Sequence, residues 1–253
     1  MYEAVIFDLD GTLVQTEKLK AASYARAAIE MCPRSITEEE VIEAFKEVVG
    51  RSRQEVATFL IDRFDLEAPA AARREELGVA TAWQAFSQIR LRIYDKMLAD
   101  PEVLTSHRWP HNIELLQRAR RASCRTGLAT MSHREQAWRV LTVLRLQEEF
   151  DFVATRDDVD NPKPHPEIYL LVANELGTSP QKCLVIEDSP TGVQAAKSAG
   201  MGVIAVTTPF TRDAFRKTNL IDRRWIVDDP RELPATLKEC LRVKEQEKSK
   251  QES

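Results

Sequence analysis

Residues 4–13 read Ala4-Val-Ile-Phe-Asp8-Leu-Asp10-Gly-Thr-Leu13, and this stretch decides how the rest of the chain is organised. The residues before Asp8 are apolar and rich in β-formers, and Gly11 follows closely, so the pattern predicts a short buried strand. In an extended chain, residues two apart point to the same side. Asp8 and Asp10 can therefore face one reacting group at the end of this strand if the chain bends between them.

The segment from about Thr16 to Leu98 has a different pattern. It has few glycines and almost no strand-like runs, and its apolar residues recur at helical spacing, which predicts four or five helices. Thr37, with Glu40 three residues later, predicts a capping box at the start of one of these helices. The sequence thus predicts a helical insertion directly after the first strand.

After Pro101 the chain alternates between predicted helices and predicted strands. The helices are expected at 113–122, 134–144, 166–176 and 192–199, and the strands at 126–130, 152–154, 183–186, 203–206 and 225–227. Such alternation is typical of a parallel sheet with right-handed crossovers. We therefore predict an α/β fold with a Rossmann-like parallel sheet. Its core domain comprises 1–15 and 100–242, a helical domain is inserted at 16–99, and the charged segment 243–253 forms a disordered tail.

Composition argues against several kinds of partner. The chain has 36 Lys and Arg residues against 40 Asp and Glu residues, a formal net charge of −4, so we expect neither nucleic acid nor an anionic membrane as a partner. Its four cysteines are far apart, and no apolar stretch approaches the length of a membrane span or of a signal peptide. We expect a cytoplasmic protein with reduced thiols that is a monomer or a weak oligomer.

Polar residues follow four of the predicted elements, at the edge of the sheet where parallel strands end. They are Asp8 and Asp10 after the first strand, Thr130 and Ser132 after the second, Lys163 in the loop before a later helix, and Glu187 and Asp188 after the strand at 183–186. Ligands of open parallel sheets bind beyond the carboxyl ends of the strands, where the strand order reverses. These side chains are therefore expected to form one site.

The chemistry of this set points to magnesium and to phosphate. Clustered carboxylates repel one another and lose hydration when they are buried, so the site needs a cation. An all-oxygen set without suitably spaced His or Cys favours Mg²⁺ over Zn²⁺. Lys163, the Thr130 hydroxyl and the adjacent backbone amides match the charge of a phosphoryl group in transfer. One aspartate can be the nucleophile while the other serves as general acid and then general base.

Each motif alone has a simpler interpretation. Asp10-Gly11 is a common turn, Lys163 between two prolines could be an exposed loop residue, and Glu187-Asp188 could cap a helix. All four in order, each near the end of a predicted strand, are hard to explain as turns.

Together the four motifs resemble the haloacid dehalogenase superfamily, through its phosphatase and phosphomutase branch. They are Phe7-Asp-Leu-Asp-Gly-Thr-Leu13, the apolar run into Thr130, Lys163, and Ile186-Glu-Asp-Ser-Pro-Thr-Gly192. The resemblance extends from Ala4 to about Leu241. It implies that the inserted helices form a cap domain that closes over the site and excludes water. Dehalogenases lack the second aspartate, so the presence of Asp10 argues against cleavage of a carbon–halogen bond.

The resemblance also implies a role for each motif. Asp8 would be the nucleophile that forms an aspartyl-phosphate, and Asp10 would be the acid and base. Thr130, the adjacent Met131 and Lys163 would bind the transferred phosphoryl group. Magnesium would be held by the Asp8 carboxylate, the Asp10 backbone carbonyl and Asp188, with Glu187 as a second or outer acidic partner.

Within the family, the chain looks most similar to the beta-phosphoglucomutase-like group. In the segment 50–53, Arg53 lies at the position of an arginine that grips a distal phosphate, and Ser132, His133 and Arg134 fall where that group contacts the same phosphate. Lys20 stands where the mutase carries a histidine. A lysine with an ordinary pKa is a poor general base near neutrality.

Lys20 therefore favours a phosphatase of a small phosphorylated metabolite over a sugar phosphomutase. A non-catalytic phosphate-binding module is a third possibility, disfavoured because all four motifs are intact. Arg53 could equally be a solvent-facing residue at the start of a helix.

Overall fold

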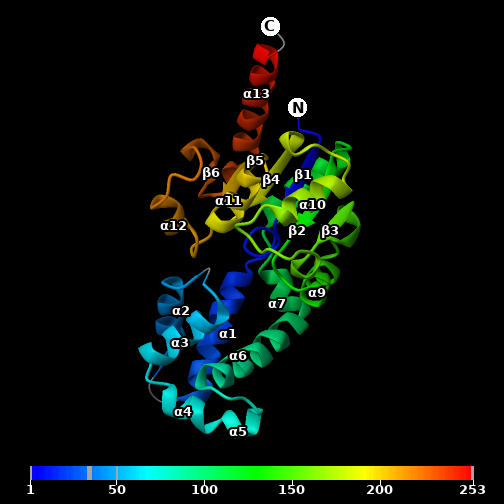
Figure 1. Ribbon diagram of the computed structural model, residues 1–253. Coiled ribbons are helices and arrows are strands. Elements are labelled where there is room, and N and C mark those ends of the chain that lie inside the picture. Colours follow the sequence, from blue (N-terminus) through cyan, green and yellow to red (C-terminus); the bar gives the residue numbers. More distant parts are fainter. Residues whose placement is uncertain (1, 33–35, 50, 252–253) are drawn as a thin grey trace. The chain divides into compact units, whose positions relative to one another are not determined.

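The computed structural model describes residues 2–32, 36–49 and 51–251. The chain divides into two compact units (Figure 1). Unit 1 comprises Met1–Gln15 and Leu104–Ser253, and unit 2 comprises Thr16–Val103. The sequence predicts two domains, divided after residues 15 and 99. Whether these are separate domains is a different question from the compactness of the two units, so the division stays a prediction.

Unit 1 is built on a parallel sheet of six strands in the order β3-β2-β1-β4-β5-β6. The strands are β1 (Ala4–Phe7), β2 (Arg125–Ala129), β3 (Phe152–Ala154), β4 (Cys183–Glu187), β5 (Gly202–Val206) and β6 (Ile226–Val227). At the carboxyl end of β1, Phe7 is paired with Leu128 on one side and with Ile186 on the other. The strand order reverses at β1, and the predicted α/β fold with a Rossmann-like sheet is confirmed.

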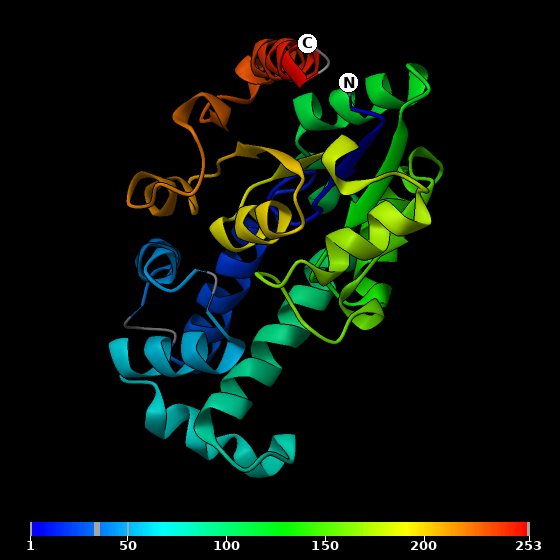
Figure 2. The same ribbon diagram turned by 45° about the horizontal axis from the view of Figure 1, so that its top comes forward.

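Helices cover both faces of this sheet (Figure 2). The helices of unit 1 are α8 (Pro110–Arg121), α9 (Arg134–Leu144), α10 (Glu167–Glu175), α11 (Pro190–Ser198), α12 (Arg212–Arg216) and α13 (Leu233–Gln251), and α7 (Pro101–Ser106) spans the boundary of the two units. Ala4 and Ile6 pack in one core cluster with Val172 of α10 and Val193 of α11. Because every residue of β1 is buried, its apolar run is continuous instead of alternating.

Unit 2 is helical in its described residues. It contains α1 (Thr16–Met31), α2 (Glu38–Lys46), α3 (Arg53–Arg63), α4 (Glu67–Ala72), α5 (Arg74–Leu77) and α6 (Ala82–Ala99). The capping box of Thr37 and Glu40 is confirmed, and two more begin α3 and α6. The count exceeds the predicted four or five helices because α4 and α5 are short helices that meet at Arg73.

The C-terminal segment differs from its prediction. Residues 243–251, predicted as part of a disordered tail, continue α13 as a helix, while 252–253 lie outside the described residues. Lys, Glu and Gln have high helix propensity, and Arg242 pairs with Glu239 one turn earlier, so residues 244–251, which include no apolar residue, still extend the helix. No helix among the described residues is long and apolar enough to span a membrane.

Candidate active site

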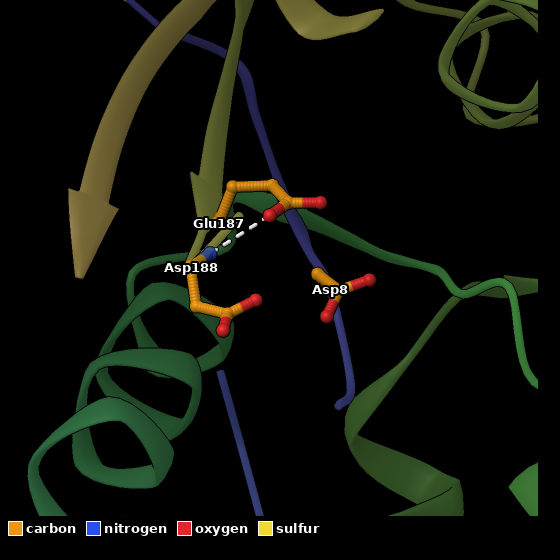
Figure 3. Close-up of side chains that lie close together, drawn as sticks. All are labelled: Asp8, Glu187 and Asp188. Carbon is orange, nitrogen blue, oxygen red and sulfur yellow. Dashed lines mark hydrogen bonds between the residues drawn. The ribbon is translucent and has the colours of Figure 1, made fainter. Parts of the chain in front are cut away.

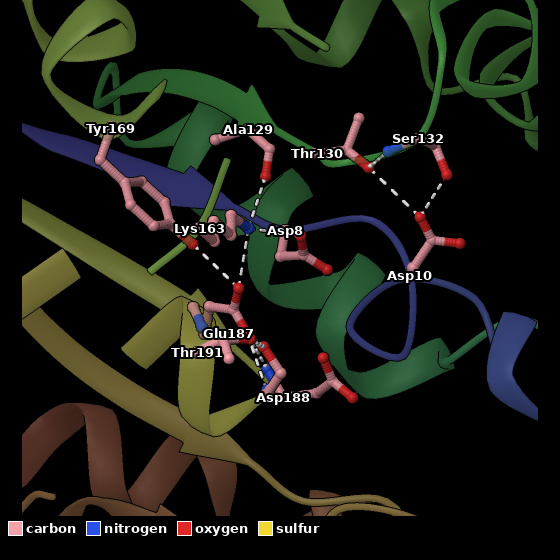
Figure 4. A network of polar contacts seen from close by, with 12 residues as sticks. Asp8, Asp10, Ala129, Thr130, Ser132, Lys163, Tyr169, Glu187, Asp188 and Thr191 are labelled. Carbon is pink, nitrogen blue, oxygen red and sulfur yellow. Dashed lines mark hydrogen bonds and ion pairs between the residues drawn. The ribbon is translucent and has the colours of Figure 1, made fainter. Parts of the chain in front are cut away.

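The carboxyl ends of β1, β2 and β4 bring together polar side chains from all four motifs (Figure 4). Asp8 follows β1, Thr130 follows β2, and Glu187 ends β4 with Asp188 next to it. All four side chains are buried. These strands are neighbours at the point where the strand order reverses, so the shared edge predicted from the sequence is present.

Lys163 reaches this edge from the loop before α10, and its side chain is only 5% exposed. Its ammonium nitrogen donates to Asp8 Oδ1 at 2.7 Å, to Glu187 Oε1 at 2.8 Å and to the carbonyl of Ala129 at 3.0 Å. An ammonium group has three N–H donors, so each has a partner. The interpretation of Lys163 as an exposed loop residue is therefore wrong.

Burial and charge act on Asp8 in opposite directions. Burial raises the pKa of Asp8 well above its usual value, Lys163 opposes this, and the charges of Glu187 and Asp10 raise it further. Burial by itself would lower the pKa of Lys163, but Asp8 and Glu187 outweigh it and hold that pKa well above its usual value. The lysine is therefore charged, and one ammonium faces several carboxylates.

The Glu187 carboxylate is saturated with hydrogen-bond donors. Its Oε1 accepts from Lys163 and, at 3.1 Å, from the hydroxyl of Tyr169. Its Oε2 accepts from the amides of Asp188 and Ser189 at 2.8 and 2.7 Å and from the Ser189 hydroxyl at 3.0 Å. The carboxylate also lies against the backbone of Gly192, where a Cβ would come within 1.6 Å of Oε1. Its orientation is fixed by contacts on every side.

Asp8, Glu187 and Asp188 each offer a carboxylate oxygen within 4.8 Å of the others (Figure 3). Because both oxygens of Glu187 already accept hydrogen bonds, Asp8 and Asp188 are better placed to hold a cation directly, with Glu187 as an outer partner. The set is all oxygen and carries excess negative charge, so it fits Mg²⁺. The family resemblance allows Glu187 to be a second or an outer acidic partner, and its role stays a prediction.

The carboxylate of Asp10 is held by hydroxyl groups at the end of β2. Its Oδ2 accepts from Ser132 Oγ at 2.5 Å and from Thr130 Oγ1 at 3.2 Å, and Thr130 Oγ1 in turn accepts from the amide of Ser132 at 3.0 Å. Thr130 and Ser132 thus contact the second aspartate directly. Ser132, which the resemblance places at a distal phosphate, orients Asp10 here.

The other expected substrate residues have different partners. His133 Nδ1 lies 2.7 Å from Asp157, and the Arg134 side chain pairs with Asp158. Met131 is half-buried and packs against the core cluster of α10 and α11.

In unit 2, Lys20 lies 3.9 Å from Glu17 and Arg53 begins α3, while Gly50 of the same segment lies outside the described residues. The substrate roles of Lys20, Arg53, His133 and Arg134 stay predictions, as does the phosphate-binding role of Met131.

Tyr169 was not among the residues predicted from the sequence, and Ser189, although part of the fourth motif, was given no role. Both donate to Glu187, and the Lys163 ammonium also lies 4.8 Å from the centre of the Tyr169 ring. A polar aromatic residue in the first turn of the helix that follows the lysine loop was the available signal.

A family model described as "Haloacid dehalogenase-like hydrolase" matches residues 5–206 of the chain. This match spans the sheet from β1 through β5, together with unit 2. All four motifs lie within it.

Relatives of known name agree with this match. A phosphorylated carbohydrates phosphatase of Thermotoga maritima is 32% identical over 200 residues, which are 79% of this chain and 82% of the relative. A phosphoglycolate phosphatase of Salmonella typhi is 30% identical over 208 residues, 80% of each chain. A solved structure from Thermotoga maritima, provisionally named a beta-phosphoglucomutase, is 29% identical with a TM-score of 0.69, and the match covers 94% of this chain and 99% of the other.

Proposed function

The chain belongs to the haloacid dehalogenase-like hydrolase family, and from this membership we propose that it is a magnesium-dependent phosphatase that acts through an aspartyl-phosphate on Asp8. Its substrate is a small phosphorylated metabolite, as the names of its phosphatase relatives suggest. None of the four cysteines, all of which lie in the described residues, is in a disulfide bond, which fits a reducing compartment, so we place this activity in the cytoplasm.

The observation that carries this proposal is the buried ion pair between Asp8 and Lys163. It joins residues 155 positions apart and sets a carboxylate at the end of β1 beside a cation that is itself held by Glu187. An ion pair without a function could form at the surface, at little cost. Burying charges, by contrast, is costly unless they are paired and hydrogen-bonded. A nucleophilic carboxylate beside a fixed positive charge is what phosphoryl transfer needs.

In the first step, an Asp8 oxygen attacks phosphorus while the bond from phosphorus to the substrate oxygen breaks. Asp10 gives its proton to the departing alcohol. In the second step, water attacks phosphorus, Asp10 takes the proton of the water, and the bond from phosphorus to Asp8 breaks. Lys163 offsets the charge on the phosphoryl oxygens in both steps. A magnesium ion held by Asp8 and Asp188 would add positive charge at the same oxygens.

Lys163 also acts on the nucleophile, and a bound magnesium ion would do the same. Burial raises the pKa of Asp8 and so disfavours the charged form that must attack. Lys163 opposes this effect, and a bound divalent cation would oppose it further. We therefore expect activity to depend on magnesium, because the ion would help to keep Asp8 ionised and would add positive charge at the substrate phosphate.

A sugar phosphomutase is the second candidate, favoured by the 29% identity to the Thermotoga maritima structure. Incubation with magnesium and a panel of sugar phosphates separates the two. Free phosphate supports the phosphatase, whereas an isomerised sugar phosphate without phosphate release supports the mutase.

The Asp8→Asn variant tests the nucleophile in the same assay. Asparagine keeps the size of the side chain but is a much weaker nucleophile, so we expect turnover to fall by at least about a thousandfold. Turnover at the wild-type level would overturn the assignment of Asp8. It would also leave only phosphate binding, without catalysis, as a role for this residue.

A further inference from the structure

Tyr169 is a fully buried tyrosine of α10 whose hydroxyl and ring face contact two different charged groups (Figure 4). Its hydroxyl donates to Glu187 Oε1 at 3.1 Å, and its ring face lies 4.8 Å from the Lys163 ammonium. The rest of the side chain packs in the core cluster of α10 and α11. Packing alone would be satisfied by phenylalanine, so the hydroxyl calls for another explanation.

The hydroxyl acts as a donor in this position. Burial, and then the charge of Glu187, raise the pKa of Tyr169 well above its usual value, so the group stays protonated. A buried hydroxyl without a hydrogen-bond partner is destabilising, and this hydroxyl avoids that by donating to a charged acceptor. The Tyr169 hydroxyl and the Lys163 ammonium donate to the same atom, Glu187 Oε1. The hydroxyl therefore fixes the position of the oxygen that accepts from the lysine.

The ring supplies a second restraint on the same lysine. Three N–H groups of Lys163 point to Asp8, Glu187 and the Ala129 carbonyl, and the negative face of the Tyr169 ring covers another side of the ammonium. The ammonium of a lysine is carried on a flexible four-carbon chain, so it keeps one position only where its surroundings restrict it. The ring is a rigid restraint because its helix packs against β2 and β3.

We infer that Tyr169 is a positioning residue of the phosphoryl-transfer site, which holds Lys163 with its ring and Glu187 with its hydroxyl. The inference rests on the proposed phosphatase function. Tyr169 touches neither Asp8 nor substrate in this scheme and acts only through these two residues. It also keeps Glu187 turned toward Lys163, which leaves Asp8 and Asp188 to hold the cation.

Two substitutions separate the two contacts. Tyr169→Phe removes the hydroxyl and keeps the ring, and Tyr169→Leu removes both while keeping an apolar side chain in the core. Tyr2→Phe is the matched control, because it removes a tyrosine hydroxyl near the opposite end of β1. All variants are made in the full chain and assayed with magnesium, p-nitrophenyl phosphate as substrate and orthovanadate as a phosphate analogue.

Loss of a partner that orients a group in the site typically costs tenfold to a hundredfold in activity. We therefore expect kcat to fall about tenfold in Tyr169→Phe and about a hundredfold in Tyr169→Leu, with a smaller change in KM. Vanadate inhibition should weaken in step with kcat. Tyr2→Phe should match the wild type. A merely structural role would instead lower the melting temperature and leave kcat per folded molecule unchanged, and that result overturns the inference.

A second readout does not need activity. The side-chain ammonium of Lys163, identified in ¹⁵N spectra by its loss in Lys163→Arg, should exchange slowly and be shifted by the Tyr169 ring. In Tyr169→Leu it should lose that shift and exchange faster, and an unchanged signal overturns the role of the ring. If the wild type releases no more nitrophenol than Asp8→Asn, the proposed function fails, while these spectra still decide whether Tyr169 holds Lys163.

Discussion

A methyl group at position 192 would occupy space that the Glu187 carboxylate already fills. The Cβ of an alanine there would lie 1.6 Å from Oε1, so Glu187 or the start of α11 would have to move. Either movement would break the bonds from Lys163 and Tyr169 to the same oxygen. Gly192 is therefore required by close approach, with no special backbone angle involved.

We expect Gly192→Ala to reduce kcat by up to about a hundredfold through the displaced Glu187. Steady-state kinetics would measure this, with Gln194→Ala, an exposed position on the same helix, as the control that keeps the wild-type rate. A Gly192→Ala enzyme with normal kcat would show that the position of Glu187 is unimportant.

Ser132 offers a second test at the residue scale, because its hydroxyl is 2.5 Å from Asp10 Oδ2. Without it, Thr130 remains as the other hydroxyl donor on that oxygen, at 3.2 Å. We expect Ser132→Ala to lower kcat about tenfold, the equivalent of one hydrogen bond to a charged group, with KM little changed. A raised KM at constant kcat would instead support the distal-phosphate contact implied by the family resemblance. Ser132→Thr, which keeps a hydroxyl, should recover most of the rate.

At the scale of elements, α10 packs closely on β2 because Gly127 has no side chain. A Cβ at this position would lie 2.4 Å from Val172 Cγ1 and 3.2 Å from Leu176 Cδ1. The same helix presents Tyr169 to the site, so the depth at which it packs bears on function as well as on stability.

We expect Gly127→Ala to lower the free energy of unfolding by about 1–3 kcal/mol, the usual cost of overpacking a core. Urea unfolding would measure the change. Val172→Ala removes the atom that clashes, so the double variant should be more stable than the sum of the two single changes. Strictly additive effects would show that α10 and β2 do not compete for this space.

At the scale of the whole molecule, the excess of carboxylates at the sheet edge couples cation binding to folding. Asp8, Glu187 and Asp188 lie close together with Lys163 as a neighbouring cation, and bringing them together costs free energy that a divalent ion offsets. A ligand that binds only the folded chain raises its stability with concentration.

Magnesium should therefore raise the melting temperature of the wild type, by about 3 °C at ten times its dissociation constant. The increase should be much smaller in Asp188→Asn, and a chelator should reverse it. Calcium should bind but inhibit, because its looser coordination disturbs the in-line geometry. Full activity with calcium would contradict this account of the metal site.

The order and type of most elements could be predicted from the sequence. The predicted helix at 134–144 and strand at 152–154 have the observed bounds. The bounds of the other predicted strands differ from the observed bounds by only a residue or two. Periodicity and turn residues are local signals, and local signals decide local structure. The extent of α13 was missed because its last residues have low apolar content, which predicts disorder, whereas their high helix propensity extends the helix.

The candidate site divides in the same way. Asp8, Asp10, Thr130, Lys163, Glu187 and Asp188 could be predicted from the sequence alone, because each follows or precedes a recognisable element and parallel strands end at one edge. Only the tertiary structure decided which atoms meet. It paired Ser132 with Asp10, gave His133 and Arg134 acidic partners, and placed Tyr169 in contact with both Lys163 and Glu187. These contacts depend on side-chain directions and packing distances across the fold, which no spacing along the chain specifies.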